Sequence, residues 1–269
     1  MPIDKKFNHL KEILAAMDSA VVAFSGGVDS TFLLRIAREV LGPEKVLALT
    51  ATSPTYPQSE LEESQALAVS LDVRQILVES NELEIPGFKN NDRDRCYLCK
   101  RELFGVCRDK AKELGYREIL DGSNTDDLAD YRPGRRAAKE LAVRSPLLEA
   151  DLSKNEIRYL SRELGLPNWF KQPFACLSSR FPYGTEITPE RLARIDRCES
   201  FLRLKKFRCY RVRYHGEIAR IEVAQEELSR LLNAELRAEL VAEFKAAGFT
   251  YVALDLEGYR TGSMNEIAR

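Results

Sequence analysis

The sequence predicts an α/β protein whose first part is a parallel β-sheet with helices on both faces. Short apolar segments rich in β-branched residues alternate with longer segments of helical periodicity, and the connections between them are short. A glycine-containing loop, Ser25–Ser30, follows the first apolar segment and opens a helical one. Strands that read as continuous apolar runs are typical of a parallel sheet covered on both sides.

Each element of this sheet has its own signal. Phe7, Leu10, Ile13, Leu14 and Met17 recur at helical spacing, and a Ser153-x-x-Glu156 capping box opens a later helix that Gly165 and Pro167 close. We expect strands at Ala20–Phe24, Val46–Thr50, Gln75–Val78 and Glu118–Leu120, and helices at residues 5–17, from the loop to Gly42, at 58–71 and at 97–114.

The pattern changes near residue 170. A loop rich in Pro and Gly (171–185) leads to Thr188-Pro189, which is a good helix start. We expect a hairpin of strands 209–214 and 218–223, a long helix over about 225–247 and a strand at 251–254. The sequence therefore predicts two domains, an α/β domain at residues 1–170 and a smaller α+β domain at 171–269.

The composition restricts the class of protein. The chain has 269 residues, 44% of them hydrophobic, and a net charge of −1, which excludes general disorder and argues against non-specific binding to nucleic acid. No apolar run is long enough for a membrane helix, and the start has no signal-peptide pattern. Six cysteines are too few for a disulfide scaffold in a chain of this length. We therefore expect a soluble, cytoplasmic protein.

The loop Ser25-Gly26-Gly27-Val28-Asp29-Ser30 has the chemistry of a phosphate site. Its glycines allow positive φ angles and close backbone approach, and successive N–H groups at a helix start bind anions. Ser25 and Ser30 can donate hydroxyls, while Asp29 can hold Mg²⁺. The alternative is an ordinary strand-to-helix turn. No Walker lysine follows, which excludes a kinase-type loop.

This loop resembles the PP-loop of the ATP-pyrophosphatases. The resemblance implies an adenine nucleotide alpha hydrolase-like fold, and cleavage of ATP between its α- and β-phosphates with Mg²⁺. It also implies that Ala48–Ser53, with Thr50 and Ala51, lies at the adenine, and that Asp121 and Gly122 join the ATP site. Asp121, Asp126, Asp127 and Asp130 are candidate magnesium or ribose contacts, although a solvated acidic loop is an equal alternative for each.

The chain more closely resembles the LarE family of sulfur-insertion enzymes. The resemblance spans nearly the whole chain and implies that two carboxylates of a pyridinium-3,5-biscarboxylic acid mononucleotide become thiocarboxylates, for nickel-pincer cofactor biosynthesis. It also implies a sulfide or protein sulfur donor and a trimer-based homo-hexamer. The motifs that carry it lie at residues 121–127, 130–134, 176–184, 211–215 and 254–265.

Three residues of these motifs are the expected substrate phosphate site. Arg211 and Arg213 are two residues apart on a predicted strand, so both guanidinium groups face the same side, where Ser179 joins them. A solvated strand face with surface ion pairs is the alternative. A lone loop cysteine such as Cys176 is more often a small buried residue. The hydroxyls and the cation beside it can lower the pKa of its thiol, and the family resemblance implies that it is catalytic.

Cys96 and Cys99 form a CxxC motif. Family members with this pair are thought to bind a 4Fe-4S cluster through it and the loop cysteine, here Cys176, leaving one iron open for sulfide. A zinc site, a redox dithiol and coincidence at a helix start are the alternatives, and His9 and His215 are isolated in the sequence. Cys107, Cys198 and Cys209 are expected to be structural.

Four other functions stay open at this point. Members without the CxxC give up the sulfur of the loop cysteine itself, so Cys176 is a candidate sacrificial donor. A tRNA-thiolating PP-loop enzyme shares the loop and the cysteines but needs a basic surface. An amide-forming synthetase uses ammonia and does not need Cys176. A non-catalytic ATP-sensing module binds nucleotide and releases no pyrophosphate.

Overall fold

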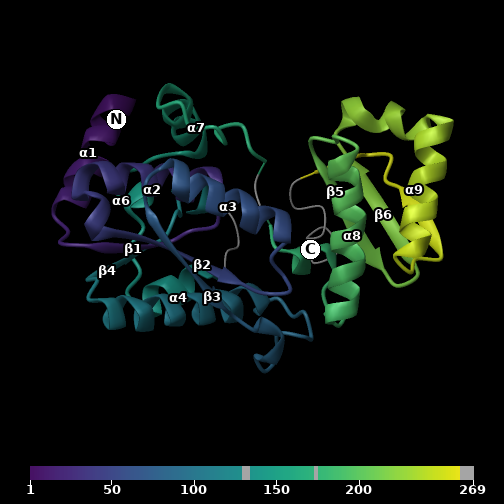
Figure 1. The fold of residues 1–269 in the computed structure, drawn as a ribbon, viewed down its shortest axis with the longest axis horizontal. Helices are drawn as coiled ribbons and strands as arrows, with labels where there is room; N and C mark the ends of the chain where they lie inside the picture. The colour runs from purple at the N-terminus through teal and green to yellow at the C-terminus, as the bar shows by residue number, and fades with distance from the viewer. Residues whose placement is uncertain (129–133, 173–174, 261–269) are drawn as a thin grey trace. The chain divides into compact units, whose positions relative to one another are not determined.

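The computed structural model describes residues 1–128, 134–172 and 175–260, and Figure 1 traces the chain through them. Asp130 and the motif residues at 131–133 and 262–265 lie outside the described residues. The chain divides into two compact units, one of Met1–Glu82 with Asp94–Phe174 and one of Leu83–Arg93 with Ala175–Arg269. No helix in the described ranges is long and apolar enough to cross a membrane.

The first unit is built on a four-stranded sheet in the order β3-β2-β1-β4, with every pairing parallel. β1 is central, so Val22 pairs with Ala48 on one side and with Leu120 on the other. This confirms the predicted α/β class. The strands are β1 (Ala20–Ala23), β2 (Val46–Thr52), β3 (Arg74–Glu79) and β4 (Glu118–Leu120).

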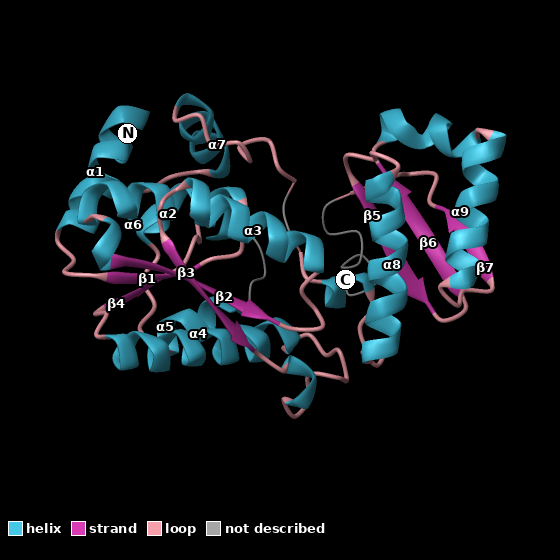
Figure 2. Ribbon diagram, viewed as in Figure 1, coloured by secondary structure: helices cyan, strands magenta, loops and turns pink. Residues whose placement is uncertain are grey.

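Helices cover both faces of this sheet (Figure 2). α1 (Ile3–Ala15) packs on α2 (Val28–Leu41), and their apolar stripes join β1 and β2 in the main core. α4 (Arg95–Leu114) and α5 (Gly134–Glu140) lie against the other face. The remaining helices are α3 (Gln58–Ser70), α6 (Pro146–Glu149), α7 (Lys154–Glu163), and the 3-10 helices η1 (Pro43–Lys45), η2 (Glu82–Glu84) and η3 (Thr125–Leu128).

The second unit contains a three-stranded mixed sheet in the order β5-β6-β7. The predicted hairpin is present: β5 and β6 are antiparallel, and β7 runs parallel to β6. Thr188 caps α8 as its sequence predicts, because its side chain accepts from the Arg191 N–H. The elements are η4 (Leu177–Arg180), α8 (Pro189–Leu204), β5 (Tyr210–His215), β6 (Ile218–Val223), η5 (Gln225–Leu232), α9 (Ala234–Ala246) and β7 (Tyr251–Leu254).

One predicted helix is wrong in its extent. The sequence predicts a single helix over residues 225–247, but η5 ends at Leu232 and α9 begins at Ala234. Asn233 separates them, because its backbone is extended (φ −59°, ψ 130°) and its side chain accepts from the Leu236 N–H at 3.0 Å. An Asn that caps the following helix cannot also continue the preceding one.

The segment Leu83–Arg93 packs with the second unit although it lies in the sequence of the first. Asn91 anchors it: its side-chain amide donates to the carbonyls of Phe181 and Pro182, at 3.2 and 2.7 Å. The Ile187 N–H donates to the Lys89 carbonyl. The sequence predicts this segment only as a polar loop. The domain division at residue 170 stays a prediction.

Candidate functional site

The phosphate loop connects β1 to α2 at the carboxyl end of the central strand (Figure 1). Gly26 has a φ of +66°, and a Cβ there would lie 3.1 Å from the Ser64 Cβ on α3. Gly27 is the N-cap of α2 and has no side chain to cover the first N–H groups of the helix. The loop therefore needs glycine at position 26, and it leaves backbone donors at a positive helix end.

Hydroxyls of the two serines line the same turn. The Ser30 Oγ donates to the Gly27 carbonyl at 3.2 Å, and the Gly27 N–H donates to the Ser25 Oγ at 3.4 Å. The two hydroxyl oxygens lie 3.3 Å apart. These groups hold the loop closed around the start of α2, in the arrangement that an anion-binding turn requires.

The two carboxylate oxygens of Asp29 differ in their contacts. Its Oδ2 forms an ion pair with the Lys154 Nζ from the start of α7, while its Oδ1 is buried without a hydrogen-bond partner among the described residues. Burial raises the pKa of the Asp29 carboxyl although Lys154 lowers it. A carboxylate with an unused oxygen beside a phosphate loop fits a divalent cation, which prefers oxygen ligands.

Lys154 is a site residue that the sequence analysis misses. It is the first residue of α7, and the predicted capping box of Ser153 and Glu156 is present and fixes that helix start. Its backbone N–H donates to the Asp126 carboxylate at 2.8 Å. No local pattern signals this lysine, because it lies 125 residues from Asp29 in the sequence.

Asn168 also escapes the sequence analysis. Its side-chain amide donates to the Gly26 carbonyl at 3.0 Å and to the Thr31 hydroxyl at 2.9 Å, and the residue is buried. Tyr56 donates from its hydroxyl to the Ser25 carbonyl at 2.9 Å. Both side chains therefore hold the backbone of the phosphate loop from outside. A lone Asn or Tyr outside a motif gives no signal of this role.

Asp121 and Gly122 support the loop in different ways. A Cβ at Gly122 would lie 3.0 Å from the Ser30 backbone nitrogen, so the chain passes directly against the start of α2. The Asp121 carboxylate accepts from the Ser123 hydroxyl at 2.7 Å and from the Ser145 hydroxyl at 2.6 Å. These contacts order the turn after β4, and the predicted ATP contact of Asp121 stays a prediction.

The residues expected at the adenine lie on β2. The Thr50 side chain is buried, donates to the Phe24 carbonyl at 2.7 Å and accepts from the Gln75 amide at 2.8 Å. Thr50 thus ties β2 to the end of β1, while Ala51 is half-buried near the end of β2. Of the acidic candidates, Asp127 accepts from the Asn124 N–H at 3.1 Å.

The CxxC motif lies in the first turn of α4. Cys96 is exposed and Cys99 is half-buried, and the Arg95 guanidinium lies 3.9 Å from the Cys96 sulfur. The Cys99 thiol donates to the buried Glu82 carboxylate at 3.6 Å, and Thr55 donates to the other oxygen of Glu82 at 3.3 Å. Two thiols one helical turn apart fit a group that prefers thiolate ligands.

Within the described ranges, His, Cys, Asp and Glu side chains form no group of three or more that could hold a metal ion. Cys107 and Cys198 are fully buried, and burial raises the pKa of each thiol to about 12, as inert structural thiols require.

Cys176 belongs to the second unit, where it precedes η4 and is half-buried. The buried Arg180 guanidinium donates to the carbonyls of Ala175 and Cys176, at 2.7 and 3.2 Å. The same guanidinium forms a two-bond pair with Glu199 of α8, at 2.9 and 2.8 Å. Although burial opposes it, Arg180 holds the pKa of Glu199 below its usual range. This pair fixes the backbone that carries the Cys176 thiol.

The two predicted arginines lie on the same side of β5, as their spacing predicts. Arg213 is buried, donates to the Ser179 carbonyl at 3.1 Å and pairs with the fully buried Glu222 at 2.7 Å. Arg211 lies 5.2 Å from the centre of the Tyr259 ring, and burial, followed by Arg180, lowers the pKa of its guanidinium. Ser179 and Arg213 are thus in contact, and Arg211 lies on the same side of β5 two residues away.

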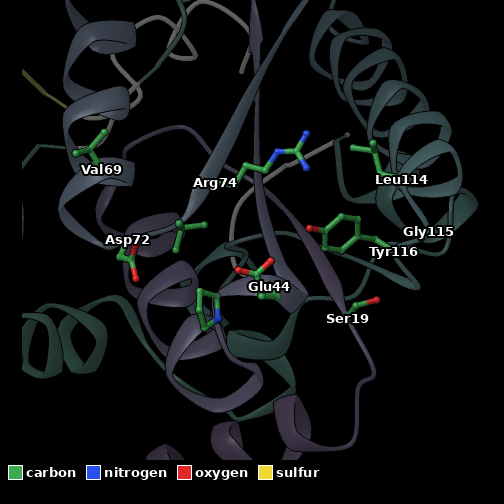
Figure 3. Close-up of a pocket in the computed structure, with 10 residues that line it drawn as sticks. Ser19, Glu44, Val69, Asp72, Arg74, Leu114, Gly115 and Tyr116 are labelled. Atoms are coloured by element: carbon green, nitrogen blue, oxygen red, sulfur yellow. The ribbon is translucent and has the colours of Figure 1, made fainter.

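A cavity of about 650 Å³ lies elsewhere in the first unit (Figure 3). It is lined by Ser19, Glu44, Arg74 and Tyr116, among others. Ser19, Glu44 and Tyr116 come just before β1, β2 and β4, and Arg74 is the first residue of β3. These are the amino ends of the strands, whereas the phosphate loop follows the carboxyl end of β1. The cavity is therefore separate from the candidate nucleotide site.

The fold and the loop together define an ATP-using α/β protein of the PP-loop class. The family model of NAD synthase matches residues 3–91. An uncharacterized protein of Synechocystis sp. is 44% identical to this chain over 98% of both chains. The pyridinium-3,5-bisthiocarboxylic acid mononucleotide synthase of Lactiplantibacillus plantarum is 38% identical over 94% of this chain and 91% of its own.

An uncharacterized protein of Methanocaldococcus jannaschii is 30% identical over 94% of this chain and 95% of its own. This level of identity over nearly the full length of each relative shows the family. The chain belongs to the LarE family of PP-loop ATP-dependent sulfurtransferases, and it is an enzyme.

Proposed function

We propose that this enzyme converts the two carboxylates of a pyridinium-3,5-biscarboxylic acid mononucleotide into thiocarboxylates for nickel-pincer cofactor biosynthesis. The observation that carries the proposal is the pairing of two features in one chain. One is a PP-loop with an unused Asp29 oxygen; the other is a half-buried Cys176 whose backbone is held beside the Ser179, Arg211 and Arg213 region. The name of the Lactiplantibacillus plantarum relative supports the choice of substrate.

A carboxylate must be activated because oxide is a poor leaving group. In the proposed reaction a substrate carboxylate oxygen attacks the α-phosphorus of ATP, and pyrophosphate leaves. A sulfur nucleophile then attacks the carbonyl carbon of the acyl adenylate, and AMP leaves with the original carboxylate oxygen. The Ser25 and Ser30 hydroxyls and the backbone N–H groups at the start of α2 would bind the phosphates.

Magnesium would be held by Asp29, with its buried free oxygen, and when bound it would neutralise charge on the phosphates. Lys154, paired with the other oxygen of Asp29, would add positive charge beside the phosphates of ATP. Ser179, Arg211 and Arg213 would bind the phosphate of the mononucleotide, which is its largest fixed charge.

We propose two sources of sulfur. Cys96, Cys99 and Cys176 would hold a 4Fe-4S cluster, which when bound supplies an iron site that carries exogenous sulfide. In the alternative, Cys176 itself attacks the acyl adenylate and forms a thioester, and elimination of its Cα proton and Sγ leaves dehydroalanine. The half-exposed CxxC beside Glu82 supports the first route, because such thiols are accessible to a metal group.

Two further properties complete the proposal. A homo-hexamer built from trimers follows from the family resemblance and is testable by native mass spectrometry. A cytoplasmic location, as expected from the sequence, is the other.

The test is pyrophosphate release by anaerobically purified enzyme with ATP, Mg²⁺ and sulfide. We expect release that depends on the dicarboxylated mononucleotide and falls at least about a hundredfold in Arg211→Ala with Arg213→Ala. Exposed Arg108→Ala, on α4, is the control and should leave the rate unchanged. Release that instead depends on ammonia or on tRNA would replace the proposal with an amide-forming or tRNA-thiolating function.

A further inference from the structure

The side of β5 that carries the two arginines of the proposed phosphate site also carries a third polar residue. Alternate residues of a strand point to the same side, so Arg211, Arg213 and His215 form one row, with neighbouring side chains about 7 Å apart. The opposite side of the strand packs inward through the buried Val212 and Tyr214. His215 therefore extends the row that faces the substrate phosphate.

The imidazole of His215 has an unused polar atom. Its Nε2 is buried, and no described residue forms a hydrogen bond with it. A buried nitrogen without a partner costs free energy, and such atoms in native proteins are satisfied by water or by a ligand. Two arginines, Arg213 and Arg220, and one glutamate, Glu222, act on this ring, so the charge around it is positive on balance and favours an anion as the ligand.

Burial and three charged residues act on the pKa of this ring. Burial is the largest and lowers the pKa of His215, and Arg220 on β6 and Arg213 on β5 lower it further, while Glu222 on β6 opposes them. Arg213 and Arg220 are directly paired across the hairpin, so both flank the same end of the row. Burial and the two arginines therefore favour the neutral imidazole when no ligand is bound.

We propose that His215 is a fourth binding residue of the substrate phosphate site, and that it takes up one proton when the phosphate of the mononucleotide binds. This rests on the proposed function, because it uses the same phosphate. The negative charge of the phosphate offsets the two arginines, so the charged imidazolium becomes favourable. The proton comes from solvent and joins the free ring nitrogen, which changes from an acceptor to a donor toward a phosphate oxygen.

The chain allows an unusually clean measurement because it contains two histidines, His9 and His215. His9 is an exposed residue of α1, in the first unit, and lies 3.4 Å from Glu12. The variant His9→Gln therefore leaves His215 as the only imidazole to be seen by NMR. Its ring resonances are titrated between pH 5 and 9, alone and with saturating nicotinate mononucleotide, which carries the pyridinium ring and the phosphate.

We expect the His215 midpoint to rise by about one pH unit or more when the mononucleotide binds. Phosphorus NMR of the ligand follows the phosphate's own titration separately. In a second measurement, His215→Gln should weaken binding about tenfold at pH 6 and less at pH 8, because only the protonated ring adds a donor.

The outcomes separate the two proposals. Saturable binding with an unmoved His215 midpoint overturns the role of His215 and leaves the phosphate site intact. Binding that is absent, or that Arg211→Ala with Arg213→Ala leaves unchanged, overturns the phosphate site itself and His215 with it. Since the titration uses the intact wild-type row, it does not depend on whether the His215→Gln variant folds.

Discussion

At the scale of single residues, the candidate site contains groups that are unfavourable in the absence of ligands. Asp29 has a buried oxygen without a partner among the described residues, and Gly26 has a positive φ angle against α3. Such features cost stability and persist where function requires them. They are therefore the positions at which substitutions should separate stability from activity.

Asp29→Asn should reduce pyrophosphate release at least about a hundredfold, because the cation loses its carboxylate ligand. The pKa of Asp29 is raised in the folded protein above its ordinary value of 3.8, so the unfolded chain loses this proton at lower pH. The Asp29 contribution to stability is therefore present below that ordinary value and is lost as pH rises through the folded pKa.

The variant lacks that pH-dependent loss. Urea unfolding of wild type and Asp29→Asn is measured from pH 3.5 to 7. The free energy of unfolding of the variant should rise relative to that of the wild type as pH rises through this window. A variant that loses stability relative to wild type as pH rises would show that Lys154 dominates Asp29 instead.

Gly26→Ala should be destabilising by about 1–3 kcal/mol and should raise the KM for ATP, since alanine resists the φ of +66° and its Cβ meets Ser64 at 3.1 Å. Gly105→Ala is the matched control, because Gly105 lies within α4 and a Cβ there meets nothing within 4 Å. The control should gain about 0.5–1 kcal/mol. Equal losses in thermal unfolding of the two variants would contradict the account.

At the scale of elements, local sequence signals predicted most of the fold. The apolar run Ala20–Ala23, the capping box of Ser153 and the Thr188-Pro189 helix start each depend on neighbouring residues, and the structure contains all of them. The helix predicted through Asn233 failed because the same Asn serves equally well as a cap. The Lys154 pair and the Asn168 bonds escaped prediction because their partners are distant in the sequence.

The Arg180–Glu199 pair connects two elements, the loop of Cys176 and α8. Arg180→Lys keeps the charge but loses the two-bond geometry and the bonds to the Ala175 and Cys176 carbonyls, so we expect about 1–3 kcal/mol of destabilisation. Arg197→Lys makes the same change in an exposed pair between α8 and α9 and should change stability by less than about 0.5 kcal/mol. Chemical denaturation measures both, and an Arg180→Lys variant of unchanged stability would contradict the role of the Arg180–Glu199 pair in holding the Cys176 loop.

At the scale of the whole molecule, the chain combines an ATP unit with a unit that carries Cys176 and the arginine row. The sequence predicted both sets of residues, because each is a compact motif. It did not predict that Leu83–Arg93 packs with the second unit, since that segment has no apolar period and is held by Asn91 through backbone carbonyls.

The chemical state of Cys176 after turnover distinguishes the two proposed sources of sulfur. With a cluster, the Cys176 peptide stays intact and the protein carries iron and acid-labile sulfide, and Cys96→Ser with Cys99→Ser abolishes both. With sacrifice, the peptide becomes lighter by one hydrogen sulfide after a single turnover. Peptide mass spectrometry with iron analysis checks this, and a Cys176→Ala variant with full activity would contradict both routes.

The central claim is that ATP makes a carboxylate oxygen replaceable by sulfur. Its most direct test uses a mononucleotide whose carboxylates are labelled with oxygen-18, with mass spectrometry of the AMP and the organic product. The account predicts that each thiocarboxylate formed is matched by one AMP that carries the heavy oxygen, while pyrophosphate is unlabelled. Thiocarboxylate formed with unlabelled AMP, or heavy oxygen in pyrophosphate, would contradict it.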